Sequence, residues 1–164
     1  MKSSILVPAL ITALALGVSA CGDDGAKAPA APARAPLTPE QVTAAISALP
    51  APYNQADYDN GRRVFARCRA CHTVTEGGPN MTGPNLWGLF GRPAGRHESY
   101  TYSKALQAAD FAWDGDRLDH WLANPRTFMP GNKMNFPGVP DDQDRRDVIA
   151  WLKVETSPHQ VAYP

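Results

Sequence analysis

Apolar side chains recur at helical spacing in several separate stretches of this sequence. The last stretch is the clearest, because Val148, Ile149 and Leu152 form one apolar face of a helix that we expect to begin near Asp141. Sixteen prolines and thirteen glycines indicate that much of the remaining chain is loop. Similar apolar spacing predicts shorter helices at 39–49, 60–68 and 116–123.

Residues at the ends of these stretches indicate where the helices begin and stop. Thr38, Pro39 and Gln41 form a capping-box signature, which predicts a helix that starts at residue 39. Asn60 is expected to cap the second helix, and Pro125 to end the third, because a residue before proline disfavours the helical conformation. The sequence leaves open whether the first helix packs on the folded domain or only extends the chain before it.

The N-terminal segment carries the features of a secretory leader. A basic start is followed by an apolar run from Ile5 to Val18, which is shorter than the roughly 20 residues that span a bilayer. The run ends in Val18-Ser19-Ala20-Cys21, which resembles a bacterial lipobox. Residues 1–20 are therefore interpreted as a lipoprotein-type signal peptide and Cys21 as the lipidated residue. The alternatives are an ordinary signal peptide that leaves Cys21 as a free thiol, and an uncleaved anchor.

The composition after the leader divides the mature chain into a tether and one small domain. Residues 22–36 hold no apolar side chain larger than alanine or proline, so this part cannot bury enough surface to order itself. We assign 21–52 to the lipidated cysteine and a Pro/Ala-rich tether with the short helix, and 53–164 to the domain. The domain is expected on the periplasmic side of a bacterial membrane, with inner or outer membrane left open.

Charge and cysteine content exclude two broad classes of protein. Sixteen basic and sixteen acidic side chains give a formal net charge of zero, which provides no basic excess for binding nucleic acid. Three cysteines are too few for a disulfide-stapled scaffold.

Residues 68–72 carry the strongest chemical signal, Cys68-Arg69-Ala70-Cys71-His72. The C-x-x-C-H pattern is typical of c-type haem attachment, in which both thiols add to the vinyl groups and the histidine ligates the iron. A zinc site would need two further clustered ligands, and the other histidines are scattered singly. A thioredoxin-like dithiol would need a βαβ pattern, which is absent. The sequence therefore predicts one covalent haem c.

Motifs around this site resemble those of class I cytochrome c, especially the mitochondrial type and its bacterial relatives. The resemblance implies an all-α fold of a few short helices wrapped around one haem, over about 61–155. It also implies that Gly61 and Phe65 meet Trp151 of the last helix. The motifs are G-R-R-V-F-A-R-C-R-A-C-H-T-V (61–74), T-G-P-N-L-W-G-L-F-G-R (82–92), Y-T-Y-S (100–103), M-P-G-N-K-M-N-F-P-G (129–138) and D-V-I-A-W-L-K (147–153).

The resemblance also implies roles for residues around the haem. Arg92, Tyr102 and Trp113 match positions that hold a haem propionate, and each carries an N–H or O–H donor that a buried carboxylate needs. Pro84 matches the proline whose carbonyl accepts a hydrogen bond from the iron-ligating histidine.

Met134 is the expected second axial ligand opposite His72. It lies in a loop bounded by Pro130-Gly131 and Pro137-Gly138, and the resemblance places the ligand at this Lys-Met pair. Met81 and Met129 are the competing methionines, for which ordinary packing is the expected role. A site closed by histidine and methionine leaves no open position for a substrate.

These features imply a one-electron carrier and no enzyme activity. The resemblance implies transfer from a quinol:cytochrome c reductase to a terminal oxidase, or to other periplasmic redox proteins. The alternative is a haem peroxidase-like enzyme that uses an opened sixth iron position.

Overall fold

The computed structural model describes residues 35–157, and within that range the regular structure is helical. No strand occurs among these residues, and the only β-type pairing described is an isolated bridge between Pro93 and Ala112. The all-α fold is confirmed. The elements are α1 (Pro39–Ser47), η1 (Tyr53–Gln55), α2 (Tyr58–Phe65), α3 (Lys104–Gln107), α4 (Gly115–Ala123), α5 (Pro125–Phe128) and α6 (Asp142–Thr156).

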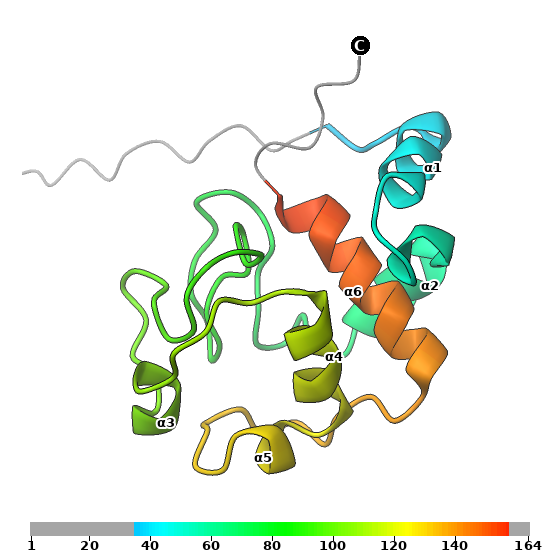
Figure 1. Ribbon diagram of the computed structural model, residues 1–164. Coiled ribbons are helices and arrows are strands. Elements are labelled where there is room, and N and C mark those ends of the chain that lie inside the picture. Colours follow the sequence, from blue (N-terminus) through cyan, green and yellow to red (C-terminus); the bar gives the residue numbers. More distant parts are fainter. Residues whose placement is uncertain (1–34, 158–164) are drawn as a thin grey trace, which may run out of the picture.

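Helix α6 is the long element on which α2 and α4 pack (Figure 1). The α2–α6 crossing is close because of Gly61: a Cβ added there would lie 2.2 Å from the Asp147 carbonyl oxygen. Next to this contact the rings of Phe65 and Trp151 stack, with their centroids 4.5 Å apart. The expected meeting of Gly61 and Phe65 with Trp151 is therefore confirmed. A side chain at 61 would separate the two helices.

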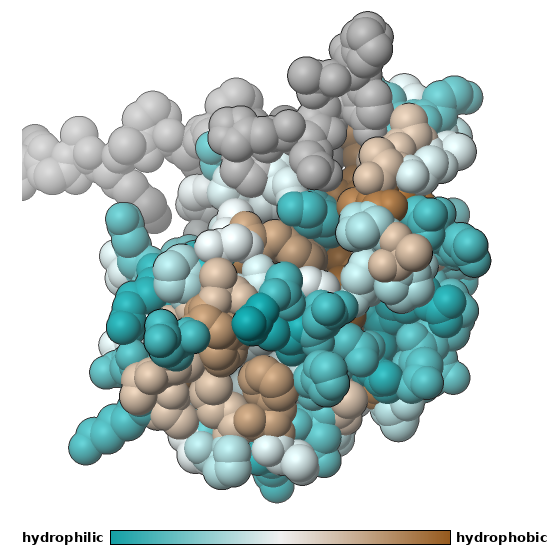
Figure 2. Space-filling view, viewed as in Figure 1, coloured by the Kyte–Doolittle hydropathy of each residue, from teal (hydrophilic) through white to brown (hydrophobic). Residues whose placement is uncertain are grey.

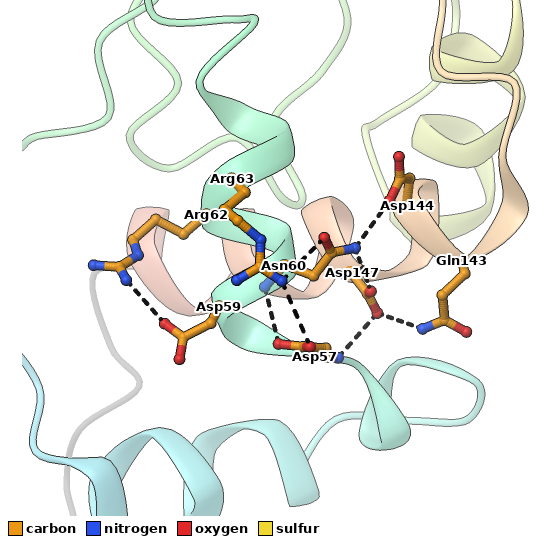
Figure 3. A network of polar contacts seen from close by, with 8 residues as sticks. All are labelled: Asp57, Asp59, Asn60, Arg62, Arg63, Gln143, Asp144 and Asp147. Carbon is orange, nitrogen blue, oxygen red and sulfur yellow. Dashed lines mark hydrogen bonds and ion pairs between the residues drawn. The ribbon is translucent and has the colours of Figure 1, made fainter.

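A polar network joins the same two helices at the start of α2 (Figure 3). Asp147 is 1% exposed, and its carboxylate accepts hydrogen bonds from the Asp57 backbone N–H, the Asn60 amide and the Gln143 amide. Asn60 also donates to Asp144. The expectation that Asn60 caps α2 is wrong. Asp57 is the N-cap, and the Asn60 side chain instead connects α2 to α6.

The middle of the domain contains the expected helix α4 and also α3 and α5, which the sequence did not predict. Helix α4 occupies 115–123, close to the expected range, with Leu118, Trp121 and Leu122 buried. The chain leaves the helix at Asn124, and Pro125 then occupies the first position of α5, capped by the Asn124 side chain. Proline suits that position, since the first helical N–H has no intrahelical partner.

Helix α1 packs on the domain, which answers the question that the sequence left open. Thr38 and Gln41 form both hydrogen bonds of the capping box. Ile46 and Leu49 are buried in a cluster with Ala150 and Val154 of α6. Fully burying side chains of this size contributes roughly 1.5–3 kcal/mol each. The cap therefore starts the helix, and the contact with α6 holds it in place.

Between residues 35 and 157, the helices are too short or too polar for any of them to cross a bilayer. The signal peptide and Cys21 lie outside the described residues.

Candidate haem site

The C-x-x-C-H segment lies on tight turns that directly follow α2. The backbone N–H of Cys68 donates to the Phe65 carbonyl at 2.8 Å, and those of Cys71 and His72 both donate to the Cys68 carbonyl at 3.0 Å. The position of α2 on α6 therefore sets where this segment lies. The turns also hold the two thiols and the imidazole within five consecutive residues.

Both thiols are free and half-buried. Burial raises the pKa of the Cys68 thiol to about 11, with a smaller opposing effect from Arg67. The Cys68 sulfur is therefore a neutral thiol at physiological pH. It has no disulfide with Cys71, so both sulfurs are available for thioether bonds.

His72 is oriented by a backbone carbonyl. Its Nδ1 lies 2.7 Å from the Pro84 oxygen, which is the contact that the resemblance implied. Burial lowers the pKa of His72, and the Pro84 hydrogen bond partly opposes that effect. A neutral ring that donates through Nδ1 keeps its Nε2 lone pair for a metal. The ring also lies against Gly83, where an added Cβ would come 2.3 Å from Cε1.

Asn85 holds the loop that carries Pro84, a role that the sequence analysis missed. Asn85 is 2% exposed, and its amide donates to the Thr73 hydroxyl and the Thr75 carbonyl. Its side-chain oxygen accepts from the Trp87 backbone N–H. An asparagine directly after Pro84 was a possible signal, because asparagine side chains often satisfy nearby backbone groups in turns.

The three expected propionate donors lie close together. The backbone N–H of Trp113 donates a hydrogen bond to the Arg92 carbonyl at 3.0 Å. The Arg92 guanidinium and the Tyr102 phenol lie close enough to interact electrostatically. Burial raises the pKa of Tyr102, and the neighbouring Arg92 charge lowers it. The Arg92 guanidinium donates to the carbonyls of Trp87 and Asn85, which uses two of its five donors. The remaining donors fit a buried carboxylate.

The methionines occupy different environments. Met134 and Met129 are partly buried and pack against the main core, whereas Met81 is 46% exposed. Asn132 holds the loop that carries Met129 and Met134. Its side-chain amide donates to the Pro125 and Met129 carbonyls, and its side-chain oxygen accepts from the backbone N–H of Met134. The sequence did not predict these contacts of Asn132. Met81 therefore lies apart from the core, whereas Met134 and Met129 both lie next to it and both stay candidates for the methionine ligand.

These donors fit an iron porphyrin. Covalent haem needs two thiols for attachment and side chains that ligate the iron, and the site offers the free cysteines, the oriented imidazole of His72 and the methionine sulfurs at the core. The guanidinium–phenol pair supplies donors for a propionate. The described residues contain no group of three or more Cys, His, Asp or Glu side chains placed to hold a metal ion, so they do not form the alternative zinc site.

Comparison with known proteins decides the family. The model of the family described as "Cytochrome c" matches residues 58–154. The chain belongs to the cytochrome c family. Cytochrome c of Kluyveromyces lactis is 39% identical over 105 residues, which cover 63% of this chain and 96% of that protein. A cytochrome c homolog of Rickettsia bellii is 37% identical over 137 residues, 84% of this chain and 73% of the relative.

Cytochrome c of Stellaria longipes is 42% identical over 105 residues, which cover 63% of this chain and 97% of the relative. Membership of the cytochrome c family establishes one covalently attached haem c and a haem-based electron carrier. The expectation of a class I c-type cytochrome is confirmed. The haem peroxidase-like alternative receives no support from these relatives.

Proposed function

We propose that this cytochrome c carries single electrons in a bacterial respiratory chain, from a quinol:cytochrome c reductase to a terminal oxidase or another periplasmic redox protein. His72 and Met134 would ligate the haem iron, and Cys68 and Cys71 would form the thioethers. When bound, the haem supplies a one-electron ferric–ferrous couple. Arg92, Tyr102 and Trp113 hold a propionate, and Pro84 orients His72.

The observation that carries this proposal is the 2.7 Å contact between His72 Nδ1 and the Pro84 oxygen. It fixes the orientation of the ring and occupies Nδ1, while burial lowers the pKa of His72 and so favours the neutral imidazole, with Nε2 free to bind iron. On the methionine side, Asn132 fixes the backbone of Met134 against the core. A Met134 thioether bound to the iron would favour the ferrous state and would leave no place for a substrate.

The Met134 assignment is tested by replacing each methionine separately. Met134→Ala should abolish the weak near-infrared sulfur-to-iron band of the oxidised protein, lower the potential and open the iron to carbon monoxide, because the soft sulfur stabilises ferrous more than ferric iron. Met81→Leu and Met129→Leu conserve volume and should keep the band. If the band persists in Met134→Ala and disappears in Met129→Leu, Met129 is the ligand.

The thioether assignment is tested on denaturing gels. Haem staining should comigrate with the wild-type polypeptide and be lost in the Cys68→Ala/Cys71→Ala variant. Staining that survives in the double variant would disprove attachment through these cysteines.

Lipid anchoring through Cys21 on the periplasmic side of the membrane forms the second part of the proposal. Two or three acyl chains, at about 0.8 kcal/mol per buried methylene, give stable anchoring. A lipid-bound Cys21 joined to the domain through the Pro/Ala-rich residues 22–36 would keep the domain near membrane complexes at a raised effective concentration.

Mass spectrometry of the protein from its native membrane should find acyl groups on Cys21. Cys21→Ser should remove them and abolish the fractionation of the protein with the membrane. A wild-type protein that begins at another residue without acyl groups would exclude the anchor, while leaving the electron-carrier assignment unaffected.

A further inference from the structure

A groove of about 610 Å³ lies between the N-terminal segment, residues 35–57, and the part of the chain that matches the cytochrome c family. Its lining includes Leu49, Pro50 and Tyr53 from before residue 58, and Phe90 and Lys153 from the matched domain. Figure 2 shows brown, apolar surface in the hollow between α1 and the body of the domain. The volume lies within the range of small-molecule sites, roughly 300–1,000 Å³.

The N-terminal wall of this groove lies outside the matched part of the cytochrome c family, which begins at residue 58. This wall is well held. Leu49 is buried in the cluster with α6, and the Tyr53 ring lies directly over Gly115, where an added Cβ would come 2.6 Å from the ring. The groove is therefore a feature that the docked N-terminal segment adds to the family fold.

The groove is lined mostly by apolar groups, with a few polar side chains among them. Trp113 and Ile149 belong to the main core and also line the groove, so a ligand there would touch the residue expected to hold a haem propionate. Asp114 and Arg117 at the start of α4 neutralise one another through an ion pair. Tyr53 contributes a hydroxyl beside them. Apolar lining with a few polar groups is typical of sites for small amphipathic molecules.

Lys153 gives the groove its uncompensated charge. Its ammonium lies 4.9 Å from the centroid of the Phe90 ring, and it forms no ion pair or hydrogen bond with any carboxylate in 35–157. Partial burial lowers the pKa of Lys153, as expected for a cation that has lost water without gaining an anion. A cation at the edge of an apolar groove is complementary to an anion with an apolar tail.

We propose that this groove binds a small apolar carboxylate, with the carboxylate on Lys153 and the hydrocarbon part between Leu49, Tyr53 and Trp113. The bound carboxylate gives Lys153 the anionic partner that it lacks among residues 35–157, and the hydrocarbon part of the ligand leaves water. Contact with Trp113 couples the site to the haem, so a bound carboxylate changes the reduction potential.

The probe is octanoate, titrated into the full-length holoprotein by calorimetry, with octan-1-ol as the neutral compound of equal chain length. Octanoate should bind with one-to-one saturation. Lys153→Gln removes the charge but keeps a polar side chain, and it should weaken octanoate binding by about tenfold, the loss expected for one charge-assisted hydrogen bond. The same variant should leave octan-1-ol binding unchanged. Lys104→Gln, at an exposed lysine outside the groove, is the matched control and should bind octanoate like wild type.

A second variant tests whether octanoate binds in this groove, and it leaves the buried core unaltered. Ala112 is exposed and lines the groove, so Ala112→Leu should fill it and abolish octanoate binding while the visible haem spectrum stays unchanged. The wild-type potential should shift on addition of octanoate, and this shift should disappear in Ala112→Leu.

Several results would overturn the proposal: no saturable binding, equal affinity of wild type and Lys153→Gln, or unchanged binding in Ala112→Leu. Equal binding of octan-1-ol and octanoate to wild type would likewise show that the groove selects apolar surface and not a carboxylate.

Discussion

Asn132 accepts a hydrogen bond from the backbone N–H of Met134 at 2.8 Å, through its side-chain oxygen. The amide of the same side chain donates to the carbonyls of Met129 and Pro125, also at 2.8 Å. One asparagine thus joins the end of α5 to the loop that carries the proposed axial ligand. A side-chain bridge of this kind substitutes for regular secondary structure in a segment that has none.

Asn132→Ala should therefore loosen the methionine loop. We expect a loss of about 1–2 kcal/mol in the free energy of unfolding from the missing hydrogen bonds. The near-infrared sulfur-to-iron band should disappear at a lower denaturant concentration than in wild type. Asn135→Ala is the matched control, because Asn135 is exposed and contacts Arg126 at the surface. A variant with an unchanged band and unchanged stability would show that Asn132 does not position the ligand.

Gly83→Ala should disturb the other side of the haem. The added Cβ would lie 2.3 Å from Cε1 of His72, so the imidazole must move away from its contact with Pro84. We expect a lower yield of holoprotein and a changed potential, measured by haem absorbance and redox titration. Thr82→Ala, at the exposed neighbouring residue, should behave like wild type. Equal potentials for both variants would contradict the close packing of Gly83 on the ring.

Gly61→Ala should destabilise the domain through the α2–α6 crossing. The new methyl group would meet the Asp147 carbonyl at 2.2 Å and the Trp151 Cβ at 2.7 Å, and neither is a flexible chain end. We expect a loss of about 3 kcal/mol in denaturant unfolding of the holoprotein. Arg62→Ala changes the adjacent exposed residue and should stay within about 0.5 kcal/mol of wild type. An unfolding free energy close to wild type for Gly61→Ala would show that α2 and α6 can move apart without loss of stability.

Tyr53 should make stability depend on alkaline pH. Burial, followed by the charges of Asp116, Asp119 and Asp114, raises the pKa of Tyr53 from 10.0 to about 12. Because the folded-state pKa is the higher one, this stabilisation is complete below about pH 10 and disappears as the pH rises to about 12. Tyr53 is only partly buried, so solvent screening reduces the effect to about 1 kcal/mol.

The measurement for Tyr53 is the difference in unfolding free energy between wild type and Tyr53→Phe across this pH range. It should be constant at neutral pH and shrink above about pH 10, because the phenylalanine cannot ionise. Asp116→Asn removes one neighbouring charge and should narrow the range over which the difference changes. A difference that does not vary with pH would contradict the raised pKa.

Several features of the fold could be read from local sequence signals. The capping box at Thr38 and Gln41 lies where the pattern placed it, and the last helix begins beside Asp141 as expected, because a cap needs only side chains within four residues. The small residue Gly61 also predicted a close helix approach correctly. Asn60 shows the limit of this reasoning. Both Asp57 and Asn60 suit an N-cap, and tertiary contacts with Asp144 and Asp147 decided between them.

The sequence by itself determined the chemistry of this protein, since the C-x-x-C-H spacing and the motifs around it specify covalent haem within a few adjacent residues. The tertiary structure alone decided how that chemistry is supported. The docking of α1 on α6, the contacts of Asn85 and the groove beside Lys153 all join segments that lie apart in the chain. Such contacts form only when packing brings the segments together, and no local periodicity or cap encodes them.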